Sequence, residues 1–141
     1  MDQQQLLDLA LDSVPIGTFR WNQITGELFW NKHHFTMLGL DPDSTKATYE
    51  LFRQRIHPED IDALEADISR ARQTHGRHDY QFRVVWPDGR IRFLRGSGLF
   101  SYDADKHAEW LTGVVIDVTE AWTAQNLLAK KERELATLIQ N

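Results

Sequence analysis

The chain has 141 residues, a formal net charge of −5 and a hydrophobic content of 41%. This length holds one domain with an appended helix, and it excludes a two-domain enzyme with a cleft between its lobes. The acidic balance provides no basic surface for a phosphate backbone or an anionic lipid, so we expect no nucleic-acid partner and no membrane contact. The absence of cysteine excludes disulfides, thiolate metal sites and thiol nucleophiles.

The N-terminal part of the sequence predicts a short helix followed by a β-hairpin. Residues 6–11 are mostly leucines in a stretch that also contains Gln and Asp, and Pro15 stops this helix, which is too short to be stable without a packing partner. After this helix the apolar residues recur at every second position, which places Phe19 and Trp21 on one face of a strand. Residues 22–26 provide a turn into a second short strand.

The middle of the chain predicts three helices. The first follows Asn31 and is capped by Gly39. The second is indicated by apolar residues at helical spacing, namely Tyr49, Phe52 and Ile56. The third and longest is expected to begin at Pro58, because proline suits the first helical position, and to end at Gly76.

The clearest strand-turn-strand pattern lies between residues 80 and 94, where apolar residues alternate and Pro87-Asp88-Gly89 supplies the turn. Gly96 and Gly98 indicate either a bulge or a close backbone approach. A further turn leads to a last strand over residues 110–116. Two strands, then helices, then three strands favour an α+β fold with an antiparallel sheet.

The composition changes after Thr119 to Ala, Leu, Gln, Glu and Lys with neither Gly nor Pro, which predicts a helix that leaves the domain. Its heptad a and d positions are mostly apolar: Ala121, Ala124, Leu128, Lys131, Leu135 and Leu138. About three heptads is the lower limit for a coiled coil, so a paired helix and a helix docked on the domain both stay open. Exposed leucines here and in residues 6–11 predict a parallel homodimer.

This order of elements resembles the PAS fold, a five-stranded antiparallel sheet with helices over one face. The motifs that carry the resemblance are Val14-Pro15-Ile16-Gly17, Trp30-Asn31, Leu38-Gly39, His57-Pro58-Glu59-Asp60 and Pro87-Asp88-Gly89. The most specific is Gly113 to Glu120, which is similar to the strand that closes PAS domains and to the Asp-x-Thr-Glu turn before an output helix. The resemblance divides the chain into a flanking helix (1–13), the PAS domain (14–118) and a C-terminal signalling helix (119–141).

PAS domains are sensory and dimerising modules of histidine kinases, cyclic-dinucleotide enzymes and chemoreceptors. The resemblance implies a non-catalytic module that passes a ligand- or partner-induced change to a downstream histidine kinase, diguanylate cyclase or receptor. It also implies a cytoplasmic location, either free or as the cytoplasmic part of a membrane-bound sensor. The rival interpretation is a small cone-shaped α+β enzyme, an isomerase or hydrolase, which would need a titratable acid inside an apolar run, and the strands contain none.

A ligand site is expected between the helices and the sheet if that space is hollow, for a small neutral molecule. Its expected apolar lining is Phe35, Leu64, Ile68 and Phe82. The histidines lack ligand spacing, since the adjacent His33 and His34 diverge by about 100° on a helix, so we expect no metal and no covalent cofactor. The missing cysteine excludes the light-driven flavin–thiol adduct of some PAS domains, while haem and non-covalent flavin stay as alternatives.

The expected signal relay is the end of the last strand, formed by Asp117, Thr119 and Glu120. The Asp117 carboxylate can accept a hydrogen bond from the backbone or the hydroxyl of Thr119, which would fix how the helix leaves the sheet. An ordinary helix cap, which contributes about 1 kcal/mol, is equally consistent with these residues.

Overall fold

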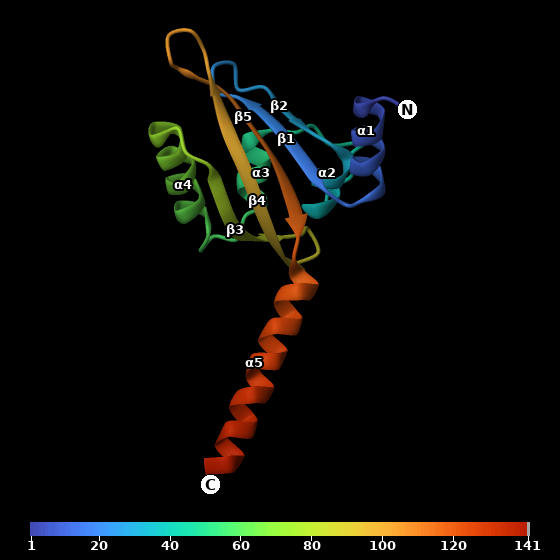
Figure 1. The fold of residues 1–141 in the computed structure, drawn as a ribbon, viewed down its shortest axis with the longest axis vertical. Helices are drawn as coiled ribbons and strands as arrows, with labels where there is room; N and C mark the ends of the chain where they lie inside the picture. The colour runs from blue at the N-terminus through green and yellow to red at the C-terminus, as the bar shows by residue number, and fades with distance from the viewer. Residues whose placement is uncertain (141) are drawn as a thin grey trace.

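The computed structural model describes residues 1–140 apart from the side chains of residues 11 and 12, and these residues form one five-stranded sheet and five helices (Figure 1). The helices are α1 (Gln3–Ser13), α2 (Lys32–Met37), α3 (Tyr49–Arg55), α4 (Ile61–Thr74) and α5 (Thr119–Gln140). The strands are β1 (Gly17–Asn22), β2 (Leu28–Trp30), β3 (His78–Val85), β4 (Ile91–Tyr102) and β5 (Ala108–Asp117).

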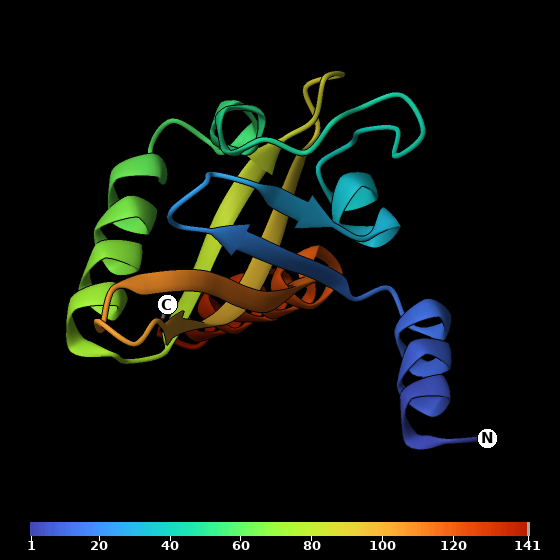
Figure 2. The same cartoon turned by 90° about the horizontal axis from the view of Figure 1, so that it is seen from above.

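The sheet is antiparallel throughout, with the strand order β2-β1-β5-β4-β3. The first and last strands of the chain are neighbours at the centre of the sheet, where Phe19 of β1 lies opposite Gly113 of β5. Helices α2, α3 and α4 lie over one face (Figure 2). The predicted α+β class and the five-stranded antiparallel sheet with helices over one face are therefore confirmed.

The core lies between that inner face and the three helices. Strand alternation directs every second side chain inward. The large aliphatic side chains with at most 1% exposure come from three strands and the residue that follows α2: Leu38, Val84, Leu94 and Val115. Burying each such aliphatic side chain contributes about 1.5–3 kcal/mol. Phe19 and Trp21 face this core, as the period of β1 predicted.

The predicted start of α4 at Pro58 is wrong by three residues, because the helix begins at Ile61. The carboxylate of Asp60 does not cap the helix. It accepts instead from the backbone N–H of Arg83 at 2.7 Å and from the Arg83 guanidinium at 2.8 and 3.0 Å. These bonds to β3 hold residues 57–60 in a turn.

The end of α4 and the glycines of β4 also differ in detail from the prediction. The helix ends at Thr74, and His75 rather than Gly76 takes the left-handed cap conformation with φ 57°. The irregularity of β4 lies at Ser101 and Tyr102, so no bulge forms at Gly96 or Gly98. At Gly96 the group that approaches closely is the side-chain ring of Tyr80 rather than another backbone.

The two terminal helices expose their apolar side chains. Leu6, Leu7 and Leu9 of α1 are 51–59% exposed, whereas the side chain of Leu11 lies outside the described residues. Helix α5 contacts the domain only at its start and then projects away from it (Figure 1), so it is not docked on the domain. Within residues 1–140, no helix is both long enough and apolar enough to cross a membrane.

Candidate functional site

A small cavity lies in the core between the sheet and helices α3 and α4. Its volume is about 30 Å³, which is room for about two water molecules. Most of its lining is aromatic, and the residues are Phe19, Trp21, Leu28, Trp30, His34, Tyr49, Phe52, Leu64, Ile68, His78, Tyr80 and Leu111. The walls therefore come from both edges of the sheet and from helices that are distant in the sequence.

The structure places the four predicted lining residues in two groups. Leu64 and Ile68 of α4 line the cavity. Phe35 and Phe82 are buried, at 8% and 3% exposure, but they belong to the surrounding core rather than to the cavity wall. Sequence reasoning missed the aromatic residues of the wall, although the alternation of Phe19 and Trp21 already indicated which side chains of β1 point inward.

Stacked aromatic pairs close the cavity on the side of β1 and β2. The rings of Trp21 and Tyr49 are stacked with their centres 4.5 Å apart, and those of Trp30 and His34 are stacked at 4.7 Å. Each offset or stacked pair adds about 0.5–1.5 kcal/mol beyond the area it buries. With these rings in place, the free space of about 30 Å³ is smaller than the planar ring system of a haem or a flavin.

Two histidines of the cavity wall are buried. Burial lowers the pKa of His34 to about 3, and its Nδ1 has no hydrogen-bond partner among the described residues. Burial also lowers the pKa of His78, although the hydrogen bond with Asp67 opposes that shift. Both imidazoles are therefore neutral at neutral pH, so neither contributes charge to the cavity.

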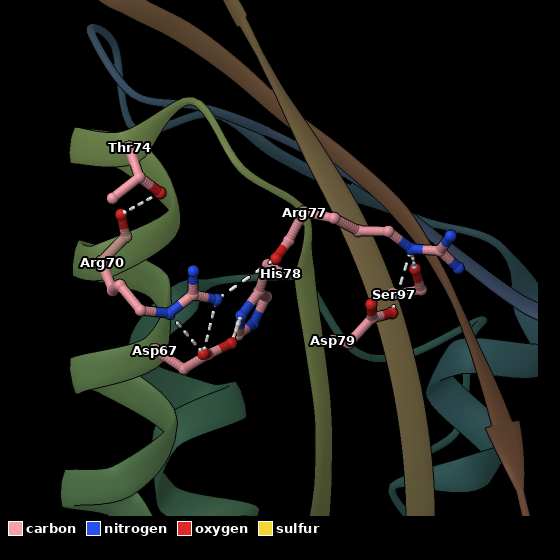
Figure 3. A network of polar contacts seen from close by, with 7 residues as sticks. All are labelled: Asp67, Arg70, Thr74, Arg77, His78, Asp79 and Ser97. Carbon is pink, nitrogen blue, oxygen red and sulfur yellow. Dashed lines mark hydrogen bonds and ion pairs between the residues drawn. The ribbon is translucent and has the colours of Figure 1, made fainter.

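His78 is held by a polar network between α4 and β3 (Figure 3). Its Nδ1 contacts the Asp67 carboxylate, which also accepts from the Arg70 guanidinium at 2.8 and 3.1 Å. Burial pulls the pKa of Asp67 upward, but the bonds from Arg70 and His78 outweigh it and hold that pKa below its usual range. Because an ionised carboxylate only accepts, Nδ1 of His78 carries the proton.

The predicted relay residues Asp117 and Thr119 are joined at the junction of β5 and α5. Oδ1 of Asp117 accepts from the Thr119 backbone N–H at 2.9 Å and from its hydroxyl at 2.6 Å. The same hydroxyl accepts from the backbone N–H of Phe93 at 2.8 Å. The expected bond between Asp117 and Thr119 is confirmed, and it extends to β4.

The sequence did not reveal the partners that β4 supplies to this junction. The Arg92 guanidinium donates to the other carboxylate oxygen of Asp117 at 2.9 Å. The ring of Phe93 stacks on Trp122 of α5 at 3.8 Å. Glu120 lies in the first turn of α5 and, with Asp117, lines a groove of about 390 Å³ beside α2. The described contacts do not include a hydrogen bond between Glu120 and the other two relay residues.

One loop of the described chain gathers three groups that could ligate a metal. The side-chain ligand atoms of Asp103, Asp105 and His107 lie within 4.8 Å of one another in the β4–β5 turn. Oδ1 of Asp103 is already bonded to the backbone N–H groups of residues 105 and 107, both at 2.9 Å. Aspartates are common in tight turns because their side chains accept from nearby backbone N–H groups, and this role accounts for the arrangement.

Comparison with known proteins adds a family match and several relatives. A family model described as "PAS fold" matches residues 27–115. The sensor protein FixL of Bradyrhizobium diazoefficiens is 26% identical over 131 residues, which cover 93% of this chain and 26% of that protein. The probable diguanylate cyclase DgcE of Escherichia coli is 27% identical over 139 residues, covering 96% of this chain and 12% of that protein. The chain therefore spans about a quarter or less of these relatives' length.

Solved structures show the same fold. A sensory box histidine kinase/response regulator from Burkholderia thailandensis superposes with a TM-score of 0.80 at 21% identity, covering 93% of this chain and 98% of that one. The N-terminal domain of a diguanylate cyclase with a PAS/PAC sensor from Marinobacter aquaeolei gives a TM-score of 0.67 at 20% identity, covering 75% and 97%.

Proposed function

The chain belongs to the PAS-fold family, and from this premise we propose that it is a non-catalytic module that senses a small neutral ligand or a partner and passes the change to an effector domain. Histidine kinases and diguanylate cyclases are the effector classes that its relatives suggest. The observation that carries the proposal is the junction, because one network joins β4, β5 and the first turn of α5.

The junction supports a relay because a shift of β4 against β5 acts directly on α5. Asp117 is bonded both to Arg92 and to Thr119, and Thr119 is bonded to Phe93. Arg92 and Phe93 belong to the strand that also contributes Leu94 to the core. A packing change in the core therefore has a short, hydrogen-bonded path to the helix that leaves the domain.

The test of the relay uses the full-length protein. Asp117→Ala and Thr119→Ala are expected to alter effector output with stimulus, without stimulus or both, while Asp105→Ala in the β4–β5 turn is the matched control and is expected to leave output unchanged. If both junction variants retain wild-type output in both states, the junction is only a helix cap, and the relay proposal is wrong.

We propose that the module dimerises in parallel through residues 6–11 and residues 119–141. Support comes from the exposure of the leucines of α5, since Leu128, Leu135 and Leu138 are 59–72% exposed; Asn141 lies outside the described residues. Burying such a stripe against a second copy removes it from water. Light scattering is expected to show a dimer that dissociates in a Leu128→Glu/Leu135→Glu variant; a monomeric wild type at high micromolar concentration would contradict the proposal.

The enzyme interpretation receives no support from the cavity. An isomerase or hydrolase of this fold class would place an acid or base against its substrate. The cavity wall formed by the described residues contains no Asp or Glu, and burial lowers the pKa of both its histidines, which makes them weak bases. Steady turnover of a small substrate by the purified domain would reverse this conclusion.

A further inference from the structure

His78 contributes a hydrogen-bond acceptor of fixed character to the cavity wall. Its side chain is only 1% exposed and lines the cavity. Its Nδ1 contacts the carboxylate of Asp67 (Figure 3), and because an ionised carboxylate only accepts, the proton of the neutral imidazole stays on Nδ1. Nε2 therefore carries a bare lone pair, and the described hydrogen bonds give it no partner. It is the one polar atom of this side chain that is left for a ligand.

The neighbours of His78 keep its ring in one orientation. The ring of Tyr80 stacks on the imidazole with the two centres 3.9 Å apart. Arg70 donates to Oδ1 of Asp67 at 2.8 and 3.1 Å, and also to the carbonyl of Arg77, the residue before His78, at 3.2 Å. A binding group is most effective when its own contacts hold it in place before the ligand arrives. Nε2 of His78 is such a preorganised acceptor.

His34 adds a second buried ring whose hydrogen-bonding capacity is not used. It is 3% exposed and lines the same cavity, and its Nδ1 has no partner among the described residues. Burial lowers the pKa of His34 to about 3, so this ring is neutral and carries one N–H and one lone pair. Buried polar atoms are nearly always paired in folded proteins. Two imidazoles with unused capacity in one cavity wall therefore point to an occupant that forms hydrogen bonds.

The rest of the wall restricts this occupant to a small neutral molecule with an apolar part. Among the described residues the wall contains no Lys, Arg, Asp or Glu, and most of it is aromatic or aliphatic. A space of about 30 Å³ has room for about two or three non-hydrogen atoms. A site of this kind, mostly apolar with a few polar groups that set orientation, suits a ligand in which one polar group is joined to carbon.

We propose that the cavity binds a short-chain alcohol such as methanol or ethanol, whose hydroxyl donates to Nε2 of His78 while its carbon atoms contact the aromatic wall. The inference rests on the proposed function and names the ligand class of the same site. Asp67 is a positioning residue, because it fixes the tautomer that makes His78 an acceptor. A molecule of the same size without an O–H or N–H leaves Nε2 unpaired in a buried site, and this is the basis of selectivity.

The test follows the imidazole nitrogens of the ¹⁵N-labelled chain by NMR. Bare and protonated ring nitrogens resonate at well-separated frequencies, so the free protein is expected to show His78 with its proton on Nδ1. Methanol is expected to shift the Nε2 resonance of His78 saturably, in the millimolar range because so small a ligand makes few contacts. Acetonitrile is similarly small and has an acceptor nitrogen but no hydrogen to donate, and it is expected to bind at least about tenfold more weakly.

An Asp67→Asn variant tests the positioning role. Arg70 donates to Oδ1 of Asp67 and His78 contacts Oδ2, so in the variant the amide oxygen faces Arg70 and the amide NH₂ faces His78. The NH₂ donates to Nδ1, which moves the imidazole proton to Nε2 and turns the acceptor into a donor. The preference for methanol over acetonitrile is expected to disappear. Asp62→Asn, at an exposed position of the same helix, is the matched control and should keep that preference.

The two probes on the unmodified chain already decide the inference, even if Asp67→Asn does not fold. It is overturned if methanol causes no saturable shift of the His78 resonance, if acetonitrile binds as tightly, or if the free protein carries the His78 proton on Nε2. A folded Asp67→Asn variant that still prefers methanol would remove the positioning role of Asp67. The junction variants test the proposed function separately through effector output, so methanol binding with unchanged output in those variants would contradict the relay and leave the ligand class standing.

Discussion

Single residues in the core make the stability of this domain depend on pH. Burial lowers the pKa of His34 to about 3, whereas an unfolded histidine has a pKa of about 6.5. Between these values the unfolded chain binds a proton that the folded chain does not, so the free energy of unfolding falls as the pH drops below about 6.5. The loss is about 1.4 kcal/mol for each pH unit below about 6.5, so acidification from pH 7 to pH 5 removes about 2 kcal/mol through this group.

The His34→Phe variant keeps an aromatic ring beside Trp30 and removes the titration. Between pH 7 and pH 5 we expect its free energy of unfolding to fall by about 2 kcal/mol less than that of wild type, measured by urea unfolding at each pH. His107→Phe is the control, because the His107 side chain is 75% exposed, and it should respond to acid as wild type does. An equal loss in wild type and His34→Phe would mean that the folded protein accepts a proton on His34 near pH 6.5.

Gly96 of β4 leaves room for the ring of Tyr80, a residue of β3 that lines the cavity. A Cβ on Gly96 would collide with the ring of Tyr80, which stacks on His78 at 3.9 Å and so cannot move freely. Gly96→Ala is therefore expected to destabilise the domain by about 1–3 kcal/mol in urea unfolding. In a Tyr80→Leu background the same change should cost clearly less. An unchanged cost there would show that the collision is not with Tyr80.

At the scale of the elements, the exit of α5 depends on one hydroxyl that serves two strands. Thr119→Val keeps the shape of the side chain but leaves the backbone N–H of Phe93 without its 2.8 Å acceptor. A fully buried donor without a partner costs about 1–3 kcal/mol, and because this N–H is partly buried we expect a loss of about 1 kcal/mol in urea unfolding. Thr119→Ser keeps the hydroxyl and should lose markedly less. Equal losses would assign the effect to packing of the methyl group.

At the scale of the whole molecule, the packing between helices and sheet limits what the domain can hold. A cavity of about 30 Å³ accommodates molecules of a few atoms and not a ring cofactor. We expect freshly purified protein to absorb only as its aromatic residues do, and to remain so after incubation with haemin or flavin mononucleotide followed by gel filtration. A Soret band or a flavin band at one equivalent per chain would show that the aromatic wall opens.

The sequence by itself determined the order of the elements, the inward face of β1 and the bond between Asp117 and Thr119. These features depend on side-chain period and on residues two positions apart, so local geometry is enough to produce them. The tertiary structure alone decided the partners that come from distant strands. The carboxylate of Asp60 accepts from Arg83, 23 positions away, instead of capping α4, and the helix begins at Ile61.

The tertiary structure also decided the cavity. Its size depends on how Trp21, Trp30 and Tyr80 meet residues of α3 and α4, and no pattern along a single element contains that distance. The same reason applies to the junction, where Arg92 reaches Asp117 across 25 positions of sequence because β4 and β5 are paired in register. Periodicity shows which side chains face inward, whereas only the packed chain shows which of them touch and what space they leave.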